Sequence, residues 1–471
     1  MGRCVAALIW NKRFFDLAQR LGGAKGSEHD AMWTYYPELL KQPVPRYTSY
    51  PTAADFVDTI GVAEHEAALD GIIAGQPISL YVHIPFCEQI CWYCGCNTAK
   101  SNHVARLDSY LNALGEEIDL IAQRLGGRGR VKRIAFGGGS PNALGPLRFT
   151  RLLDMLMLTF RLENPIFSIE LDPRSFSEDW VRVIRSAHIS HASLGVQTFS
   201  PELQKAIGRI QPKEDIIVTV EALRRAGISS LNFDLMYGLP GQSREELDRC
   251  LTQAIALKPD RVALFGYAHV PTLIPRQRQI DDANLPGATE RFVMAKLGYQ
   301  RLTEAGYYPV GFDHFALPHD RLAKVAKSGL LRRNFQGFTD DQSDVLLGLG
   351  ASAISEFPDL IVQNEKNIGD YRRRLEAGGL SSSRGIRRSL DDQRRAAIIA
   401  DILCHGSADL SALNHGRHHR DQLAPFVERG LIAYHDDVLR LAPDGLPYAR
   451  SIAAQFDSYR DLAPKVLSSA I

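Results

Sequence analysis

The sequence of 471 residues predicts an α/β fold, an open, partial β/α barrel followed by a mainly helical C-terminal domain. The first observation is an alternation, between about residues 77 and 365, of short β-rich runs and amphipathic stretches. Repeated β–α units of this kind form a parallel sheet. The second observation is the number of units, because the six or seven that we find are fewer than the eight of a full barrel. We therefore expect the sheet to remain open.

The expected strands and helices follow one another along this region. Strands are expected at Ile78–Ile84, Val131–Phe136, Ile166–Leu171, His191–Val196, Ser229–Leu235, Arg261–Tyr267 and Tyr308–Phe312. Helices with apolar residues at helical spacing are expected at Val104–Leu125, Glu214–Ala226, Arg244–Leu257 and Thr289–Ala305. Gly227, Pro259 and Gly306 mark the ends of three of these helices.

Four segments divide the chain. Residues 1–40 are expected to form an N-terminal extension of unknown role, and residues 41–76 a connecting segment whose prolines prevent a continuous helix. Residues 77–365 form the partial barrel and residues 366–471 the C-terminal helical domain. In that domain the polar stretch 381–395 predicts a linker. Helices are expected at Ala396–Leu403, Arg420–Glu428 and Leu446–Tyr459, and a hairpin at Leu431–Tyr434 and Val438–Leu441.

Composition excludes several classes of protein. The 55 Lys and Arg residues balance 54 Asp and Glu residues, which argues against an extended nucleic-acid surface. No apolar run reaches the roughly 18 residues of a membrane span. The short apolar stretch near the N-terminus is followed by charged residues and no cleavage site, so it does not predict a signal peptide. We expect a cytoplasmic protein without a nucleic-acid or membrane partner, and a monomer because nothing demands a partner chain.

Four of the seven cysteines lie within ten residues, directly after the first expected strand. The spacing Cys87-x3-Cys91-x2-Cys94 places three thiolates on one loop, and Cys96 follows. Three thiolates on a four-iron cluster leave one iron open to bind a small molecule. Zinc is the alternative, but a structural zinc site usually takes four ligands from two separated pairs, and no second pair follows. The spacing therefore favours an iron–sulfur cluster. His83, just before the loop, is a candidate to support the cluster without binding it.

Glycine and polar residues also stand at the ends of the other expected strands. In β/α barrels the site is built from the carboxyl ends of the strands and the loops that follow. Glu170 and Asp234 stand between apolar neighbours, and a buried carboxylate needs a polar partner; a surface salt bridge is the less favoured alternative for both. The set comprises Gly137–Ser140, Glu170, Asp172, Gln197, Asp234, Ala268 and His269.

Together these motifs resemble the radical S-adenosylmethionine (SAM) superfamily and, within it, the family of oxygen-independent coproporphyrinogen III oxidases, also called dehydrogenases. The resemblance extends from about Pro45 to the C-terminus. It rests on PRYTSYPTA (45–53), YVHIPFC (81–87), CGCN (94–97), FGGGSPN (136–142), IELDPR (169–174), GVQTF (195–199), NFDLMYGLPGQ (232–242), GYAHVPT (266–272), GFDHFALP (311–318) and RNFQGF (333–338).

The resemblance implies a barrel of the radical SAM type, a [4Fe–4S] cluster on Cys87, Cys91 and Cys94, and two SAM molecules. It places Tyr81, Gly138, Glu170 and Ile354 at the first SAM. It places Tyr93, Gly139, Ser140, Gln197, Arg209, Asp234, Ala268 and Gln336 at the second. The implied reaction converts two propionates of coproporphyrinogen III to vinyl groups through a 5′-deoxyadenosyl radical, giving protoporphyrinogen IX. It needs an electron donor and an electron acceptor, which the sequence does not identify.

Four anionic carboxylates on the substrate call for arginine or lysine. Arg46, Arg174 and Arg209 are candidates by position, and the sequence does not choose among them. Three alternatives remain open: another radical SAM activity on a tetrapyrrole, a haem carrier with a non-functional cluster, and a zinc-stabilised structural protein. Cys96, Arg209 and the RNFQG segment count against the first alternative.

Overall fold

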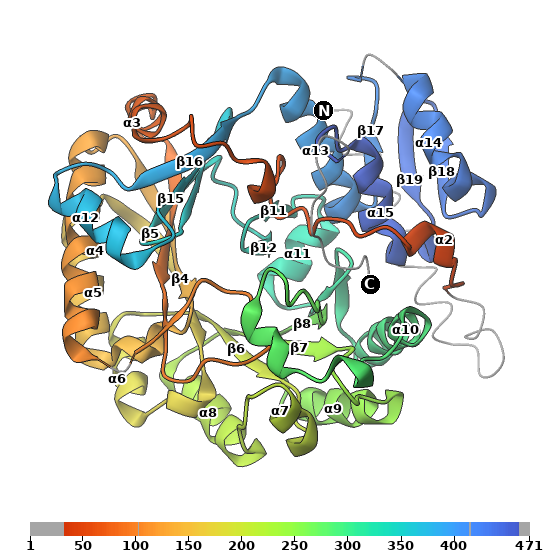
Figure 1. Cartoon of the computed structure of the whole chain (residues 1–471), viewed down its shortest axis with the longest axis horizontal. Helices are drawn as coiled ribbons and strands as arrows, with labels where there is room; N and C mark the ends of the chain where they lie inside the picture. Colours follow the sequence, from red (N-terminus) through yellow and green to blue (C-terminus); the bar gives the residue numbers. More distant parts are fainter. Residues whose placement is uncertain (1–32, 102, 414–415, 461–471) are drawn as a thin grey trace.

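One twelve-stranded sheet organises the computed structural model, which describes residues 33–101, 103–413 and 416–460 (Figure 1). Six parallel strands lie side by side in chain order at its centre, so the first six expected strands are confirmed. They are β1 (Pro77–Ile84), β4 (Arg130–Gly138), β5 (Leu162–Leu171), β6 (His191–Gln197), β7 (Ser230–Tyr237) and β8 (Arg261–Gly266).

A seventh parallel strand lies beside β1 and was not predicted. This strand, β13 (Val345–Leu349), is buried at every position and follows a hairpin rather than a helix, so it gives no β–α signal. The seventh strand that we did expect, at Tyr308–Phe312, is instead β9 (Tyr308–Val310). It pairs antiparallel with β10 (His314–Ala316), because Gly311 adopts a left-handed conformation and turns the chain back at once.

The other edge of the sheet extends beyond the predicted boundary at residue 366. Here β14 (Ile354–Glu356), β15 (Leu360–Asn364) and β16 (Ser382–Arg387) pair antiparallel. The linker predicted at 381–395 is therefore wrong. Ser382 is buried and hydrogen-bonds His65, and the polar sequence forms the strand at the edge of the sheet. The outer strands β16 and β9 are not paired with each other, so the barrel is open, as expected.

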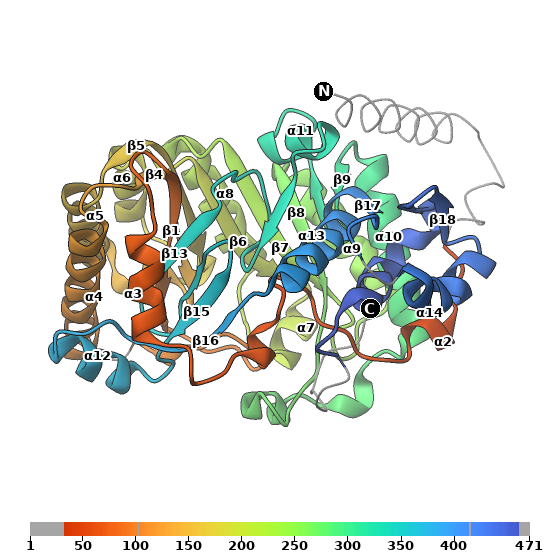
Figure 2. The same cartoon turned by 90° about the horizontal axis from the view of Figure 1, so that it is seen from above.

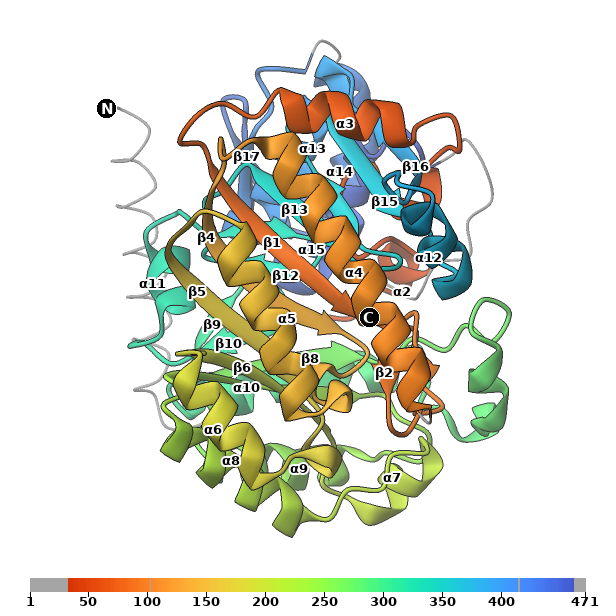
Figure 3. The same cartoon turned by 90° about the vertical axis from the view of Figure 1, so that its left-hand side faces the viewer.

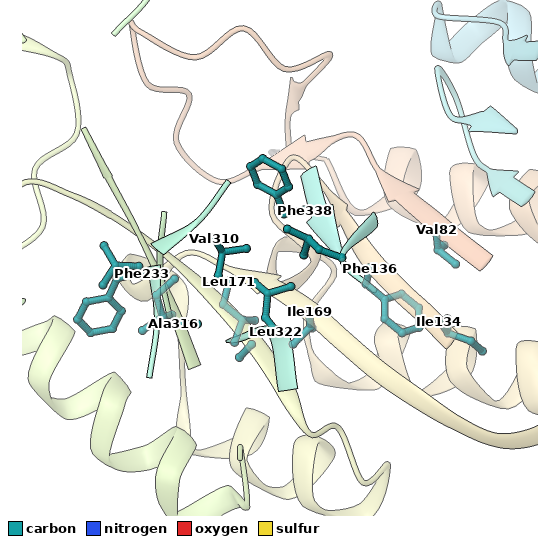
Figure 4. Packing of buried hydrophobic residues seen from close by; sticks show 14 of the residues in the cluster. Val82, Ile134, Phe136, Ile169, Leu171, Phe233, Val310, Ala316, Leu322 and Phe338 are labelled. Carbon is teal, nitrogen blue, oxygen red and sulfur yellow. The ribbon is translucent and has the colours of Figure 1, made fainter. Parts of the chain in front are cut away.

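Helices cover the outer face of the parallel strands, with α4, α5, α6, α8 and α9 in a row (Figure 3). The helices expected at four places begin and end within two residues of those observed. The set comprises α4 (Val104–Leu125), α5 (Pro146–Thr159), α6 (Glu178–Ser186), α8 (Lys213–Ala226), α9 (Arg244–Ala256) and α10 (Ala288–Glu304). Alternate strand residues pack beneath them, as Ile134, Phe136, Ile169 and Leu171 do in Figure 4.

The C-terminal elements gather at one end of the barrel (Figure 2). α13 (Leu390–His405) and α14 (Gly416–Glu428) contain the first two helices expected there. The expected hairpin is confirmed as β18 (Ile432–His435) and β19 (Val438–Leu441), and β17 (Ser407–Asp409) extends it to three strands. The helix expected at Leu446–Tyr459 is wrong. Only α15 (Ala449–Ala453) is α-helical, between two 3-10 turns, because Pro447 prevents an earlier α-helical start.

The segment from Trp33 onward crosses to these C-terminal elements. Its backbone and side chains hydrogen-bond them: the Tyr36 N–H donates to the hydroxyl of Tyr448 at 2.8 Å, and the Tyr47 hydroxyl donates to Asp457 at 3.0 Å. α2 (Pro37–Leu40) and α3 (Val62–Asp70) precede the first strand. Residues 1–32 of the predicted extension lie outside the described residues, and the division into four segments stays a prediction. Within the described ranges, no helix is both long and apolar enough to cross a bilayer.

Candidate active site

The cysteine loop leaves the end of β1 and returns toward α4. Its first cysteine belongs to β2 (Phe86–Cys87), which pairs with β3 (Ala99–Lys100) and closes the loop at its base. Cys91 is buried, and Cys87 and Cys94 are half-buried. Burial raises the pKa of the Cys87 thiol to about 12. The pKa of Cys94 is lowered to about 6, mainly by its hydrogen bond with Cys96.

These thiols fit a cluster better than a single ion. Sulfurs around one zinc, each about 2.3 Å from the metal, lie close together. Among the described residues no three His, Cys, Asp or Glu side chains are placed to hold one ion. In an iron–sulfur cluster each cysteine binds a different iron, so its ligands lie farther apart. Two arginines also donate hydrogen bonds to Cys91 Sγ.

Those two arginines are held by a single buried carboxylate, Asp172. Arg174 binds both of its oxygens, at 3.0 and 2.6 Å, and Arg209 lies 3.2 Å from Oδ1. Both guanidinium groups also donate to Cys91 Sγ, at 3.4 Å from Arg174 and 3.3 Å from Arg209. Burial alone would raise the pKa of Asp172, but Arg209 and Arg174 hold it below its ordinary value. Asp172 thus positions two cations against a predicted cluster ligand. Sequence analysis noted this residue at a strand end but gave it no role.

The lack of a side chain at Gly195 leaves room for the Arg209 guanidinium. A Cβ on Gly195 would lie 3.1 Å from both the Arg209 guanidinium and the Gln197 amide, so the GVQTF motif keeps this position open. The Gly195 carbonyl accepts from Arg209 Nη2 at 2.7 Å. Gln197 itself adopts φ +64°, next to a bulge in the pairing of β6 with β7. A left-handed conformation at a non-glycine residue is strained, and such strain clusters at functional sites.

A second set of contacts anchors the cysteine loop, and sequence analysis missed it. The Gln277 amide donates to the carbonyls of Tyr93 and Ala268, at 2.9 and 3.0 Å. Arg276 donates to Thr98 at 3.1 Å, 178 positions earlier in the chain. No sequence motif marks these residues, because their partners in the cysteine loop, Tyr93 and Thr98, lie 184 and 178 positions earlier in the chain. Gln277 holds the carbonyls of Tyr93 and Ala268, and the assignment of those two residues to a second SAM stays a prediction.

The glycine stretch at the end of β4 packs against the start of the cysteine loop. A Cβ on Gly139 would lie 2.4 Å from the Phe86 carbonyl, and one on Gly138 would overlap the His83 ring. The backbone N–H groups of Gly139 and Ser140 donate to the carbonyls of Ile84 and Phe86. The glycines therefore allow close approach of the loop, whatever ligand they also contact.

Strand register places the polar interior residues abreast. His83 pairs with Gly137, Glu170 with Ser193, and Ser193 with Asn232, so these positions face the same side of the sheet. Gly138 N–H donates to Glu170 at 3.1 Å. Burial, and next the nearby Asp234, raise the pKa of Glu170 to about 7.

Asp234 lies within β7, which runs to Tyr237, rather than at the strand end. It accepts hydrogen bonds from Ser193 at 3.0 Å and from Asn232 at 2.8 Å. Both acidic residues of the predicted site thus have polar partners in the barrel interior, as expected for buried carboxylates.

Three further predicted residues are Tyr81 in β1, Gln336 between β11 and β12, and Ile354 in β14. The Tyr81 hydroxyl is 3.1 Å from His83 Nδ1, and the Tyr81 ring meets Phe335 edge-on at 4.8 Å. Phe335 and the exposed Gln336 form the turn between β11 (Arg332–Asn334) and β12 (Gly337–Thr339). Ile354 lies in β14, beyond β13, and packs in a cluster with Phe56. The roles of Gln336 and Ile354 stay predictions.

Comparisons with known proteins agree with this geometry. The family model of the radical SAM superfamily matches residues 81–254. An oxygen-independent coproporphyrinogen III oxidase of Bradyrhizobium diazoefficiens is 40% identical over 440 residues, 92% of this chain and 98% of the relative. The Escherichia coli enzyme of the same name is 36% identical over 427 residues, 88% of this chain and 93% of the relative.

A solved structure gives the same result. Coproporphyrinogen III oxidase from Escherichia coli, described as a radical SAM enzyme, superposes with a TM-score of 0.85 at 34% sequence identity. The superposition covers 91% of this chain and 100% of that one.

Proposed function

The chain belongs to the family of oxygen-independent coproporphyrinogen III oxidases within the radical SAM superfamily, and on this basis we propose how its residues perform that reaction. The reaction is the oxidative decarboxylation of two propionate side chains of coproporphyrinogen III, giving protoporphyrinogen IX without molecular oxygen. It requires breaking an unactivated C–H bond, which side chains alone do not do.

The loop cysteines hold the cofactor. We assign Cys87, Cys91 and Cys94 as the three ligands of a [4Fe–4S] cluster, whose remaining iron is open to SAM. The single observation that supports this most strongly is that Arg174 and Arg209, both held by Asp172, donate hydrogen bonds to Cys91 Sγ. When bound, the cluster and SAM supply the radical chemistry that breaks the C–H bond.

The barrel interior binds SAM and keeps water out. Tyr81, Gly138, Glu170 and Ile354 are assigned to a first SAM. Tyr93, Gly139, Ser140, Gln197, Arg209, Asp234, Ala268 and Gln336 are assigned to a second. Glu170 and Asp234 supply acceptors for hydroxyl and ammonium groups, and the buried backbone around them excludes solvent. His83 is buried against Gly138 and positions the glycine stretch.

The remaining partners are a tetrapyrrole substrate, an electron donor for the cluster and an acceptor for the electrons that the substrate loses. The cytoplasmic location, the monomeric state and the lack of a nucleic-acid partner stay predictions.

An anaerobic assay tests the proposal. The protein is reconstituted with iron and sulfide, reduced, and given SAM and coproporphyrinogen III, and products are separated by chromatography. We expect two 5′-deoxyadenosines per protoporphyrinogen IX, and neither product from Cys87→Ala. Deoxyadenosine without a vinyl product would move the substrate to another tetrapyrrole. A full iron load with no deoxyadenosine would favour the carrier alternative.

A further inference from the structure

Arg174 connects the end of β5 to the cysteine loop. It lies in the 3-10 turn Pro173–Ser175, and its Nε donates to Asp172 Oδ1 at 3.0 Å. Its Nη1 donates to the Gln89 side chain at 3.2 Å, and its Nη2 donates to the Gln89 carbonyl at 3.3 Å and to Cys91 Sγ at 3.4 Å. Gln89 stands between the first two cysteines of the loop. One guanidinium group therefore contacts the strand end, the loop backbone and a predicted cluster ligand.

Two buried cations and one buried carboxylate meet at Cys91. Arg174 and Arg209 both donate to Cys91 Sγ, and Asp172 holds both of them. No more than 9% of any of these three charged side chains is exposed, so water screens their charges little. Glu88, the neighbouring acidic residue on the loop, is exposed, and its charge is therefore screened more. The sulfur of Cys91 thus accepts two charged hydrogen bonds from groups that solvent barely reaches.

Contacts of this kind act on the electron affinity of an iron–sulfur cluster. One-electron reduction makes the cluster more negative by one unit of charge. Donors to the ligand sulfurs and nearby positive charge stabilise the reduced form more than the oxidised form, which raises the reduction potential. A guanidinium suits this role because it stays charged, and its planar fork can contact a carboxylate and a sulfur at the same time.

Arg174 and Arg209 differ in their other contacts. Arg209 donates through Nη2 to the Gly195 carbonyl at 2.7 Å and through Nε to Gln211 at 3.0 Å, so it also belongs to the barrel interior beside β6. Within the part of the chain that the structure describes, the side chain of Arg174 donates only to Asp172, Gln89 and Cys91. A substitution of Arg174 therefore changes the surroundings of the loop and leaves the position assigned to the second SAM in place.

We propose that Arg174 is a positioning residue that raises the reduction potential of the cluster, by holding a charged hydrogen-bond donor against Cys91 Sγ. This rests on the proposed function and concerns its electron input. A low-potential one-electron donor supplies the electron, and the cluster accepts it without taking up a proton. A residue that only helped the loop to fold would change how much cluster the chain holds, and not the potential of each complete cluster.

A redox titration of the reconstituted full chain without SAM tests the proposal. Titanium(III) citrate sets the potential, and electron paramagnetic resonance measures the reduced cluster. At the midpoint of wild type, the ratio of reduced to oxidised cluster in Arg174→Met should be lower by at least about tenfold, which corresponds to a midpoint about 59 mV more negative. Iron and sulfide analysis selects samples with complete clusters for the comparison.

Arg182→Met is the matched control. Arg182 pairs with the exposed Asp179 on α6, and its removal takes the same charge from the surface. Its midpoint should equal that of wild type. A complete cluster in Arg174→Met with the wild-type midpoint would overturn the proposal. So would a shift of the same size in Arg182→Met, because the effect would then not depend on contact with Cys91.

Two further measurements do not need Arg174→Met to hold its cluster. Arg174→Lys keeps the charge but not the planar fork, so its midpoint should lie between those of Arg174→Met and wild type. Pulsed electron paramagnetic resonance of reduced wild type, made with arginine that carries the heavy nitrogen isotope, should show magnetic coupling between the cluster and arginine nitrogen. Absence of that coupling in wild type would overturn the proposal.

The two proposals fail separately. If the midpoint depends on Arg174 but wild type forms no protoporphyrinogen IX, the proposed reaction fails and the role of Arg174 stands. If wild type forms the product while complete clusters with and without Arg174 share one midpoint, the role of Arg174 fails alone.

Discussion

Two groups of arginines in this protein differ in the contacts that hold them. Arg174 and Arg209 share the carboxylate of Asp172, which the chain itself supplies. Arg46, Arg291 and Arg450 line one cavity with Asp313, and there Arg46 and Arg450 donate to the backbone carbonyls of Gly266 and Val44. Buried cations that are paired with a carboxylate are costly to separate from it.

Removing the sulfur that the first group contacts should have the largest effect. Cys91→Ser should lower bound iron to background and deoxyadenosine formation by more than about 100-fold. Losing a ligand should cost more than losing the hydrogen-bond partner of a ligand, which costs about 10- to 100-fold. Iron and sulfide analysis with the chromatographic assay measures both quantities. Cys96→Ser is the control, because Cys96 is not one of the three proposed ligands and its backbone N–H can still donate to Cys94, so this variant should keep its iron. Equal iron loss in both variants would mean that Cys96 is also a ligand.

Breaking the group that Asp172 holds should cost nearly as much. Asp172→Asn leaves two buried guanidinium groups without their carboxylate, which should lower the free energy of unfolding by roughly 3 kcal/mol or more. Urea unfolding of the apoprotein measures the change. Asp179→Asn, at an exposed pair with Arg182, should change the unfolding free energy by less than about 1 kcal/mol. Comparable losses in the two variants would show that Asp172 has no special role.

Glu117 is a buried acidic residue that extends the comparison with Asp172, because neutral donors hold its carboxylate. It accepts from Gly350 N–H at 2.6 Å, Asn364 at 2.6 Å and Tyr371 at 2.8 Å. Burial nevertheless raises its pKa from 4.5 to about 7. The folded state therefore binds this proton more tightly than the unfolded state. The resulting stability is fully present below pH 4.5 and is lost as pH rises through about 7.

Urea unfolding at pH 5 and pH 8 tests this sign. Between pH 5 and pH 8 the free energy of unfolding of wild type should fall by about 2 to 3 kcal/mol more than that of Glu117→Gln, since one pKa unit corresponds to about 1.4 kcal/mol. Asp172, whose pKa is lowered, should contribute in the opposite direction, with stability lost at acid pH. The same pH dependence in Glu117→Gln and wild type would contradict the assignment to Glu117.

The smallest effect on stability is expected in the cavity. Arg46→Met keeps a stem over Phe265, removes one hydrogen bond to Gly266 and relieves repulsion with Arg291 and Arg450. The unfolding free energy should change by no more than about 1 kcal/mol. Urea unfolding of Arg46→Met and of Asp172→Asn under the same conditions compares the two groups directly. A loss of 3 kcal/mol would indicate that Arg46 is a structural residue like Arg174.

The strands from β1 to β8 could be predicted because apolar residues recur along them with site residues between, as around Glu170 in β5. The strands beyond β1 could not. β13 is buried throughout, and β16 is a polar strand at the edge of the sheet, so neither shows the expected period. In the site, the cysteine spacing was sufficient to find the loop. Gln277 and Asp172 act through contacts with distant residues, so no local pattern marks their roles.

The pairing of the two ends of the chain has a consequence for how the protein is made. Tyr47 bonds Asp457, 410 positions later, and the cavity takes Arg46 from one end and Arg450 from the other. Apart from Arg276 and Gln277, the contacts of the cysteine loop described above come from residues up to Arg209. Because a chain emerges from the ribosome N-terminus first, the cysteine loop and the two arginines that contact Cys91 are synthesised long before the residues that complete the cavity. We expect nascent chains to bind iron before the cavity forms.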